Sequence, residues 1–179
     1  ADHYLLEMYL GVPFFDFIAG AMGFERAIYY FAEEKDEVLL SLKERYDNHQ
    51  LRLIDAACQN TRFESFFVGS SFSCNSLLGP TLWRKFDKPG IKKIASRLHE
   101  QGKLLHVHFH GKCMETLSDF REIGIDCVCP FERGPGGDVN TLEDLKTVRK
   151  LLANQVTMNG NVHTVETLIR GTEIGRAHV

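Results

Sequence analysis

The sequence predicts an α/β protein whose parallel strands form part, roughly the C-terminal half, of a (β/α)8 barrel. From residue 65 onward, short apolar segments alternate with amphipathic helical segments. The connections are a few residues long, and this order of strand and helix requires a parallel sheet. The strands are apolar enough to need helices packed on them. An open doubly wound sheet is the alternative, but no Gly-x-Gly-x-x-Gly motif follows the first strand to favour a dinucleotide site.

Local sequence signals predict the helices. Hydrophobic residues recur every three or four positions from Asp36 to Cys58, which is typical of an amphipathic helix. Pro89 must kink or split the helix that begins at Pro80, because proline lacks an amide hydrogen. Thr141 precedes Asp144 at the spacing of a capping box. These signals predict helices at 23–31, 36–58, 80–101, 113–123, 141–153 and 164–170.

The strands are short apolar runs bounded by turn-forming residues. Each run ends near glycine, serine, asparagine or proline, which interrupt regular structure. The pattern predicts strands at 65–71, 103–110, 125–130 and 155–161. Cys127 and Cys129 share one face of the third of these strands, and we interpret both as core residues.

Composition limits the class of protein. The chain has 179 residues, 44% hydrophobic and 25% charged, which suits one soluble globular domain. A net charge of -3 offers no basic surface for nucleic acid. No apolar run is long enough for a membrane span. The five cysteines contain no Cys-x-x-Cys pair, so we expect reduced thiols and a cytoplasmic protein. The sequence does not indicate an oligomeric state.

Both ends differ from the pattern of a natural protein. The chain starts at Ala1 inside an apolar segment, so we expect an internal piece of a longer enzyme. Residues 174–179, with Glu173 as a further candidate, break the preceding pattern and resemble a translated sequencing adapter. We therefore assign 1–172 to a partial barrel domain and 173–179 to a non-native tail, in which His178 is no ligand.

The most informative segment is the strand at 103–110. It carries His106, His108 and His110 at every second position and then breaks at Gly111. Side chains two residues apart lie on the same face of a strand. The carboxyl ends of parallel strands are where ligands bind in α/β folds. The alternative is that these histidines form hydrogen bonds inside a core.

Polar residues also follow the other predicted strands. His108 and His110 with one further donor would make a zinc half-site, while Glu132 and Asp138 are candidates for catalytic proton transfer. The candidates for substrate binding are Ser70, Ser71, Arg133, Asn159 and Asn161. The alternatives are that polar residues mark where strands meet solvent, and that Glu132 forms a salt bridge with Arg133 or Lys112.

Across residues 24–172 the chain resembles the uroporphyrinogen decarboxylase superfamily, which includes cobalamin-dependent, zinc-bearing methyltransferases. Each motif is weak alone, and their order and spacing carry the resemblance. The motifs are Leu78-Gly79-Pro80 leading through Phe86 and Pro89 to Ile94, His108-x-x-Gly111, Gly124-x-Asp126, Pro135-Gly-Gly-Asp138, Gly160-Asn161 and Gly171-Thr172. The resemblance implies a (β/α)8 barrel.

The resemblance implies two activities. In the methyltransferase branch, a His-x-Cys-Gly motif binds zinc with a further cysteine near the C-terminus, and the partner is a corrinoid protein. Here His110 replaces that cysteine, Cys113 could substitute only with loop movement, and the third ligand would lie beyond the chain. The decarboxylase branch needs no metal and removes acetate carboxylates from a tetrapyrrole. Its N-terminal arginines are missing here, and its serine corresponds to Ser70 or Ser71 only with a gap.

The leading hypothesis is a fragment of a zinc- and corrinoid-linked methyltransferase that is inactive by itself. The His-x-His pair favours this branch because it suits a metal better than an acetate group. Decarboxylation in tetrapyrrole biosynthesis is the close alternative, and a barrel that binds a small molecule without turnover is the second.

Overall fold

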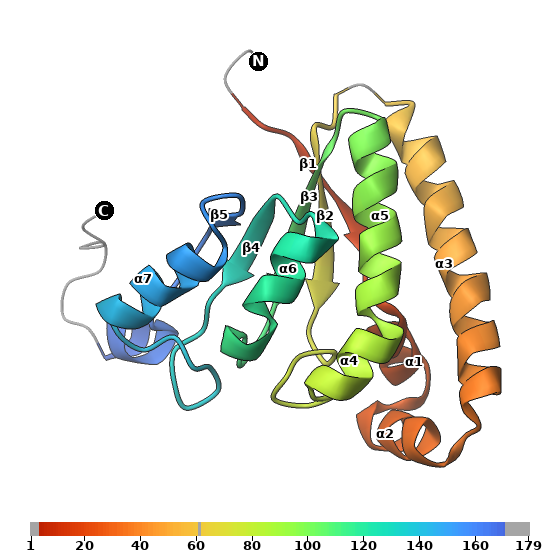
Figure 1. Ribbon diagram of the computed structural model, residues 1–179, viewed down its shortest axis with the longest axis horizontal. Helices are drawn as coiled ribbons and strands as arrows, with labels where there is room; N and C mark the ends of the chain where they lie inside the picture. The colour runs from red at the N-terminus through yellow and green to blue at the C-terminus, as the bar shows by residue number, and fades with distance from the viewer. Residues whose placement is uncertain (1–3, 61, 171–179) are drawn as a thin grey trace.

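The computed structural model describes residues 4–60 and 62–170. Its centre is a five-stranded parallel sheet whose strands lie side by side in chain order (Figure 1). The strands are β1 (Glu7–Gly11), β2 (Ser65–Ser70), β3 (Leu104–Phe109), β4 (Cys127–Pro130) and β5 (Thr157–Met158). The strands expected after residue 65 are confirmed in the expected order, although β5 is shorter than predicted.

The strand β1 was not predicted from the sequence. It pairs in parallel with β2, with Glu7 opposite Ser65. The alternation of Glu7 and Tyr9 with Met8 and Leu10 is the signal of this strand. Continuous apolar residues on both sides obscure that alternation in the sequence.

The helices largely follow the predictions. The long helix has the predicted bounds, and the helix containing Pro89 is split, with Pro89 in the first turn of its second part. The capping box between Thr141 and Asp144 is present. The elements are α1 (Phe14–Met22), α2 (Phe24–Glu33), α3 (Asp36–Cys58), α4 (Pro80–Phe86), α5 (Lys88–Glu100), the 3-10 turn η1 (Met114–Thr116), α6 (Leu117–Ile123), α7 (Leu142–Leu151) and the π-helical turn η2 (Thr164–Ile169).

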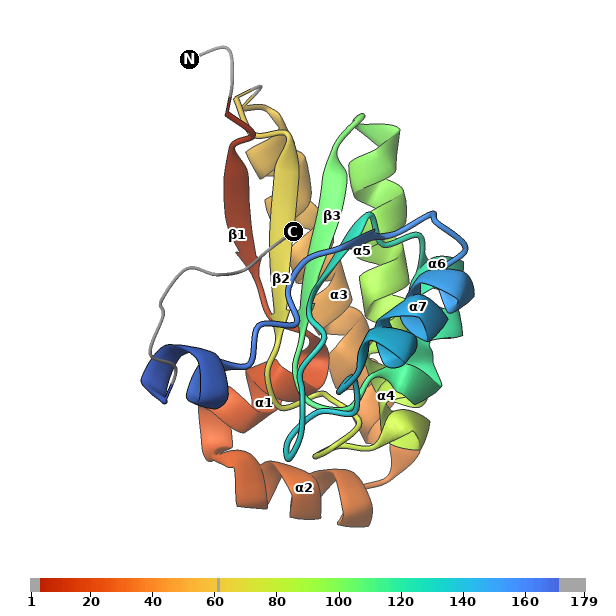
Figure 2. The same cartoon turned by 90° about the vertical axis from the view of Figure 1, so that its left-hand side faces the viewer.

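The main helices lie along one face of the sheet. Figures 1 and 2 show α3, α5 and α6 beside one another on this face, and α5 packs on both β3 and α3. The large hydrophobic core lies between these helices and the strands. This layering is the one expected for part of a (β/α)8 barrel.

Alternation along the strands separates two kinds of side chain. Toward the helices, β3 presents Leu105, Val107 and Phe109, each at most 1% exposed. On the opposite face it presents His106 and His108. Neighbouring strands add acidic, hydroxyl, aromatic and thiol groups to that face, namely Glu7, Ser65, Phe67, Cys127 and Cys129. Barrel interiors are usually filled by branched aliphatic residues, so this polar face is suited to binding or chemistry.

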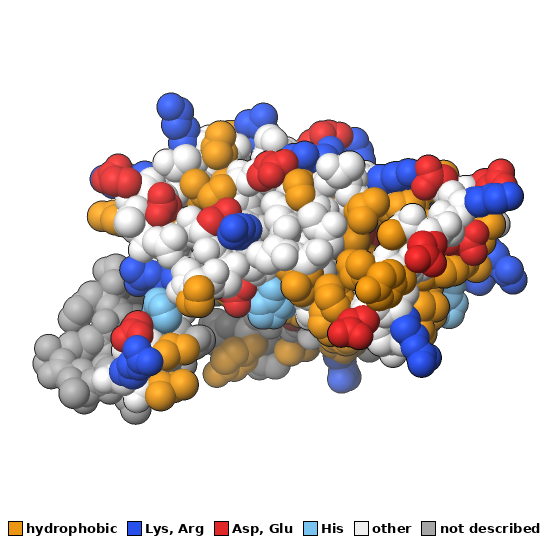
Figure 3. Space-filling model, turned by 90° about the horizontal axis from the view of Figure 1, so that it is seen from below, with side chains coloured by type: hydrophobic (Ala, Val, Ile, Leu, Met, Phe, Trp, Pro, Cys, Tyr) orange, Lys and Arg blue, Asp and Glu red, His pale blue; other side chains and the backbone are white. Residues whose placement is uncertain are grey.

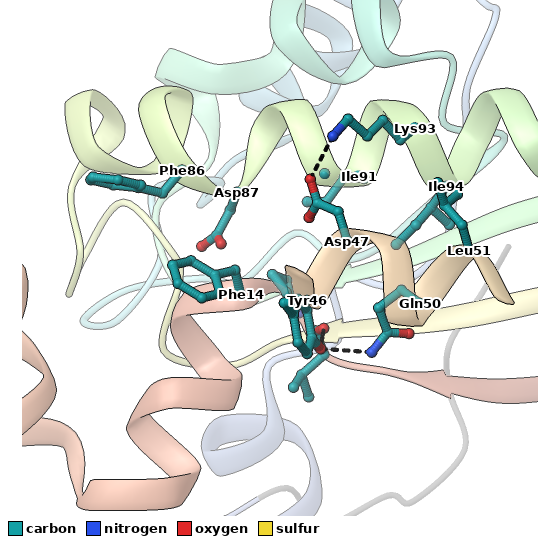
Figure 4. A pocket seen from close by; sticks show the side chains of 13 residues that line it. Phe14, Tyr46, Asp47, Gln50, Leu51, Phe86, Asp87, Ile91, Lys93 and Ile94 are labelled. Carbon is teal, nitrogen blue, oxygen red and sulfur yellow. Dashed lines mark hydrogen bonds and ion pairs between the residues drawn. The ribbon is translucent and has the colours of Figure 1, made fainter. Parts of the chain in front are cut away.

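A buried carboxylate fastens α1 to the helical layer. Asp87, between α4 and α5, is 1% exposed, and its Oδ1 accepts a hydrogen bond from the backbone N–H of Phe15 at 3.0 Å. Figure 4 shows Asp87 next to Phe14, in a pocket that continues past Tyr46 of α3. Burial, with the nearby charge of Asp16, raises the pKa of Asp87 to about 7. This junction therefore depends on protonation near neutral pH.

Two other expectations concern membranes and the chain end. Within the described residues, no helix combines the length and hydrophobicity that a membrane span requires. The tail expected at 173–179 lies outside the described residues.

Replacing Asp87 with Asn should remove a pH dependence of stability. An acid with a raised folded pKa stabilises the fold below its unfolded pKa of about 3.9, and this contribution is lost as the pH rises to about 7. Asn cannot ionise, and its oxygen can still accept the Phe15 N–H. Between pH 4 and 8 the parent should lose on the order of 4 kcal/mol of unfolding free energy through this group, and Asp87→Asn should not show this loss.

Urea unfolding at a series of pH values measures this difference. Asp55→Asn is the control, because Asp55 is an exposed carboxylate on α3 that pairs with Arg97. Parallel pH profiles for the parent and Asp87→Asn would contradict the assignment of this pH dependence to Asp87.

Candidate active site

The strand β3 delivers two histidines to its carboxyl end. His108 lies within the strand and His110 follows it directly. Their Nε2 atoms are 2.7 Å apart, and the rings are perpendicular with centroids 4.2 Å apart. The i, i+2 spacing that places both on one face therefore brings the two imidazoles into direct contact.

The Nδ1 atom of each imidazole contacts a side chain of β4 or of the loop after it. His108 Nδ1 lies 3.1 Å from Cys129 Sγ on β4, and His110 Nδ1 lies 3.0 Å from Glu132 Oε1 in the loop after β4. The second oxygen of Glu132 accepts a hydrogen bond from the backbone N–H of Gly111. These contacts orient both rings so that their Nε2 atoms face each other.

With both imidazole rings neutral, one assignment of hydrogens satisfies every contact in this group. Burial raises the pKa of the Cys129 thiol to about 11, so the thiol stays protonated and donates to His108 Nδ1. His108 then donates from Nε2 to His110, which donates from Nδ1 to Glu132. Desolvation and the neighbouring His110 lower the pKa of His108, which agrees with a neutral ring. The result is a chain of donors from Cys129 to Glu132.

The histidine pair fits part of a zinc site. Zinc binds imidazole nitrogen at about 2.0–2.1 Å, so two tetrahedral ligands stand roughly 3.4 Å apart and the rings need to separate by about 0.7 Å. Glu132 lies behind His110, where it orients the ring and adds no ligand. Within residues 4–60 and 62–170, no three His, Cys, Asp or Glu side chains are placed to hold a metal ion. A zinc ion here needs a further donor.

The histidine pair lines a cavity of about 410 Å³ at the carboxyl ends of β3 and β4. Figure 3 shows this end of the molecule, where histidine side chains reach the surface near hydrophobic and acidic groups. The polar side chains of the lining are His108, His110, Glu132, Arg133 and His163. The volume is in the range of small-molecule sites.

Residues 51–179 match the family model described as uroporphyrinogen decarboxylase (URO-D). The chain belongs to the URO-D family. A solved structure described as a methyltransferase from Methanosarcina mazei shares the fold, with a TM-score of 0.55 and 16% sequence identity over 85% of this chain. The match covers 42% of the methyltransferase, so the chain spans less than half the length of that structure. No curated protein matches the chain significantly.

Four of the predicted site residues meet at the cavity of this URO-D family chain. They are His108, His110, Glu132 and Arg133. Glu132 pairs with His110 and Gly111, and the alternative salt bridges to Arg133 or Lys112 are not formed. Arg133 instead donates from Nη2 to the carbonyl of Asn140 at 2.6 Å.

The two serines that were predicted to bind substrate do not line the cavity of the histidine pair. Ser70 is fully buried, because alternation along β2 turns it toward the helices and leaves Gly69 on the open face. Ser71 follows β2, and its backbone N–H donates to Asp16 Oδ1 at 2.8 Å. Asp16 accepts two more such bonds, from Phe72 and Ser73.

Two of the remaining predicted residues, Asp138 and Asn161, hold loops in place. Asp138, predicted to be catalytic, accepts hydrogen bonds from the backbone N–H groups of Cys113 and Met114 at 3.0 and 3.2 Å. The side-chain amide of Asn161 donates to two backbone carbonyls of the loop after β4. Asn159 lines a different cavity, together with Glu7. Burial raises the pKa of the Cys113 thiol, and the nearby charge of Asp138 raises it further.

Two residues of the site were not predicted from the sequence. Cys129 is buried, as its interpretation as a core residue expects, and its thiol also contacts His108. Its signal is the parallel register, in which His108 and Cys129 are neighbours on the open face. The other is His163, and its position after Gly160-Asn161 carries no periodic signal.

The loop that positions Glu132 requires glycine at position 137. A Cβ atom there would lie 1.9 Å from the Glu132 carbonyl oxygen and 2.7 Å from the Glu132 Cβ. Gly137→Ala should therefore displace Glu132, weaken its bond to His110 and cost about 2 kcal/mol or more in unfolding free energy. Urea unfolding and the NMR signal of the His110 Nδ1 proton measure the two effects.

Gly136→Ala is the matched control for this prediction. A Cβ atom at position 136 would have no neighbour within 4 Å, and the substitution lies in the same loop. Equal stability of the two variants would show that the close approach at Gly137 does not hold the loop.

Proposed function

We propose that this chain supplies the histidine pair of a zinc site in a corrinoid-linked methyltransferase of the URO-D family. The supporting observation is the pair of Nε2 atoms 2.7 Å apart, each ring oriented through Nδ1 by Cys129 or Glu132. A carboxylate behind a histidine is a common arrangement around zinc ligands. The shared fold with the methyltransferase from Methanosarcina mazei is compatible with this branch.

His108 and His110 would hold the zinc ion through Nε2. Zinc bound there supplies Lewis acidity, which lowers the pKa of a coordinated thiol or water. Glu132 keeps the His110 proton on Nδ1, so Nε2 of His110 carries a lone pair that accepts from His108 and could bind zinc in its place. His108 must move its proton from Nε2 to Nδ1, and Cys129 Sγ then becomes the acceptor. Glu132 and Cys129 thus favour the tautomers of His110 and His108 that can bind zinc through Nε2.

Decarboxylation of a tetrapyrrole is the second candidate function. The donor chain from Cys129 to Glu132 can transfer a proton without a metal, as general acid–base catalysis requires. Binding of a small molecule without turnover is the third candidate. It would be favoured by the absence of both zinc and turnover in the longer protein.

Zinc content separates the candidates. The longer protein that contains this chain should purify with stoichiometric zinc, and both His108→Ala and His110→Ala should lose it, because each removes a nitrogen ligand. Inductively coupled plasma mass spectrometry measures the metal. A parent without zinc whose variants lose turnover on a porphyrinogen would reject methyl transfer in favour of decarboxylation.

Glu132→Gln should weaken zinc binding roughly 10- to 100-fold, the usual effect of losing a partner that orients a metal-binding histidine. The amide keeps the size of the side chain but cannot accept from both His110 and Gly111. Competition with a chromophoric chelator measures the dissociation constant. Glu115→Gln is the control, because Glu115 is exposed and pairs with Arg84. Unchanged affinity in Glu132→Gln would exclude an orienting role for Glu132.

A further inference from the structure

Besides the histidine pair, two further side chains that can donate hydrogen bonds line the cavity, namely His163 and Arg133. His163 lines this cavity, just before η2. Its Nδ1 accepts a hydrogen bond from the backbone N–H of Glu166 at 3.2 Å. An imidazole nitrogen that accepts carries no proton, so neutral His163 is protonated on Nε2. His163 therefore offers an N–H donor whose tautomer the chain itself determines.

Arg133 lines the same cavity and carries a charge that no described carboxylate neutralises. Its Nη2 atom donates to the backbone carbonyl of Asn140 at 2.6 Å, which holds the guanidinium in place. The adjacent Glu132 has both oxygens engaged by His110 and Gly111. The remaining N–H groups of Arg133 are thus available, and guanidinium groups bind carboxylate and phosphate oxygens well.

We propose that Arg133 and His163 form an oxyanion-binding subsite, which holds an anionic group of the ligand while its reactive end lies at the His108–His110 pair. The proposal deepens the proposed function and rests on the same cavity. His163 would determine specificity with a directed N–H group, and Arg133 would supply the positive charge. The flanking Val162 and Val165 line the cavity with apolar surface, so the anion is partly screened from water.

The cavity is large enough for a ligand whose anionic group lies at Arg133 and His163 while its reactive end lies at the histidine pair. About 410 Å³ accommodates a small molecule that contacts both groups at once. Carboxylate and phosphate share the chemistry that the subsite recognises, because each offers two or more acceptor oxygens.

Inorganic phosphate and acetate serve as probes with the longer protein that contains this chain, freed of zinc by chelation. Isothermal titration calorimetry gives the affinity, and the His163 Nε2–H signal in long-range ¹H–¹⁵N spectra reports the site. Arg133→Gln and His163→Ser should each weaken binding of the preferred probe roughly tenfold, the effect of losing one hydrogen bond to a charged group. Serine keeps an acceptor for the Glu166 N–H but removes the Nε2–H donor. His49→Gln on α3 is the control and should bind the probe like the parent.

The outcomes distinguish this proposal from the zinc site. His110→Ala should lose zinc and keep its affinity for the probe, whereas His163→Ser should keep zinc. Unchanged affinity in both Arg133→Gln and His163→Ser would overturn the subsite. Binding of either probe only in the presence of zinc would also overturn it, because the metal would then be the anion site. A tighter affinity for acetate than for phosphate identifies a carboxylate ligand, and the reverse identifies a phosphate ligand.

Discussion

Carboxylates that accept backbone N–H groups hold the carboxyl end of this sheet together. Asp16 accepts three such bonds from the segment after β2, and Asp138 accepts two from the segment after β3. Glu132 accepts one from Gly111 and also orients His110. Loops at strand ends have few backbone partners of their own, so these charge-assisted bonds determine the shape of the cavity.

The same arrangement explains why many polar strand-end residues do not contact the cavity. Each oxygen of Asp138 accepts one backbone amide of the segment after β3, and this residue does not line the cavity. Glu132 serves both structure and site, because one oxygen binds the backbone and the other binds an imidazole. The position of Glu132 depends in turn on Gly137, where a side chain would collide with its carbonyl.

The open face of the sheet has an unusual composition for a barrel interior. Two adjacent strands, β3 and β4, place imidazole and thiol groups side by side, with His108 opposite Cys129 and His106 opposite Cys127. His106 also contacts Glu7, whose carboxylate accepts from Ser65. Polar groups are thus linked across four strands. Such a face stays partly hydrated or binds a ligand, because buried polar groups need partners.

Periodicity in the sequence was sufficient for most of the fold. Three local signals in the sequence are confirmed by the structure. They are the 3.6-residue repeat at Asp36–Cys58, the helix break near Pro89 and the capping box that begins at Thr141. The contact between His108 and His110 was also foreseeable, since strand alternation alone places them together. β1 was missed because a short alternating segment inside a longer apolar run carries little periodic information.

Only the tertiary structure decided which polar residues share the cavity. The inward direction of Ser70 depends on the exact pairing register, in which a shift of one residue reverses every side chain. The contact of Cys129 with His108 depends on the neighbouring strand, and the approach of His163 depends on the path of the chain after β5. Sequence patterns therefore specify faces within one element, whereas contacts between elements far apart in the chain arise from packing.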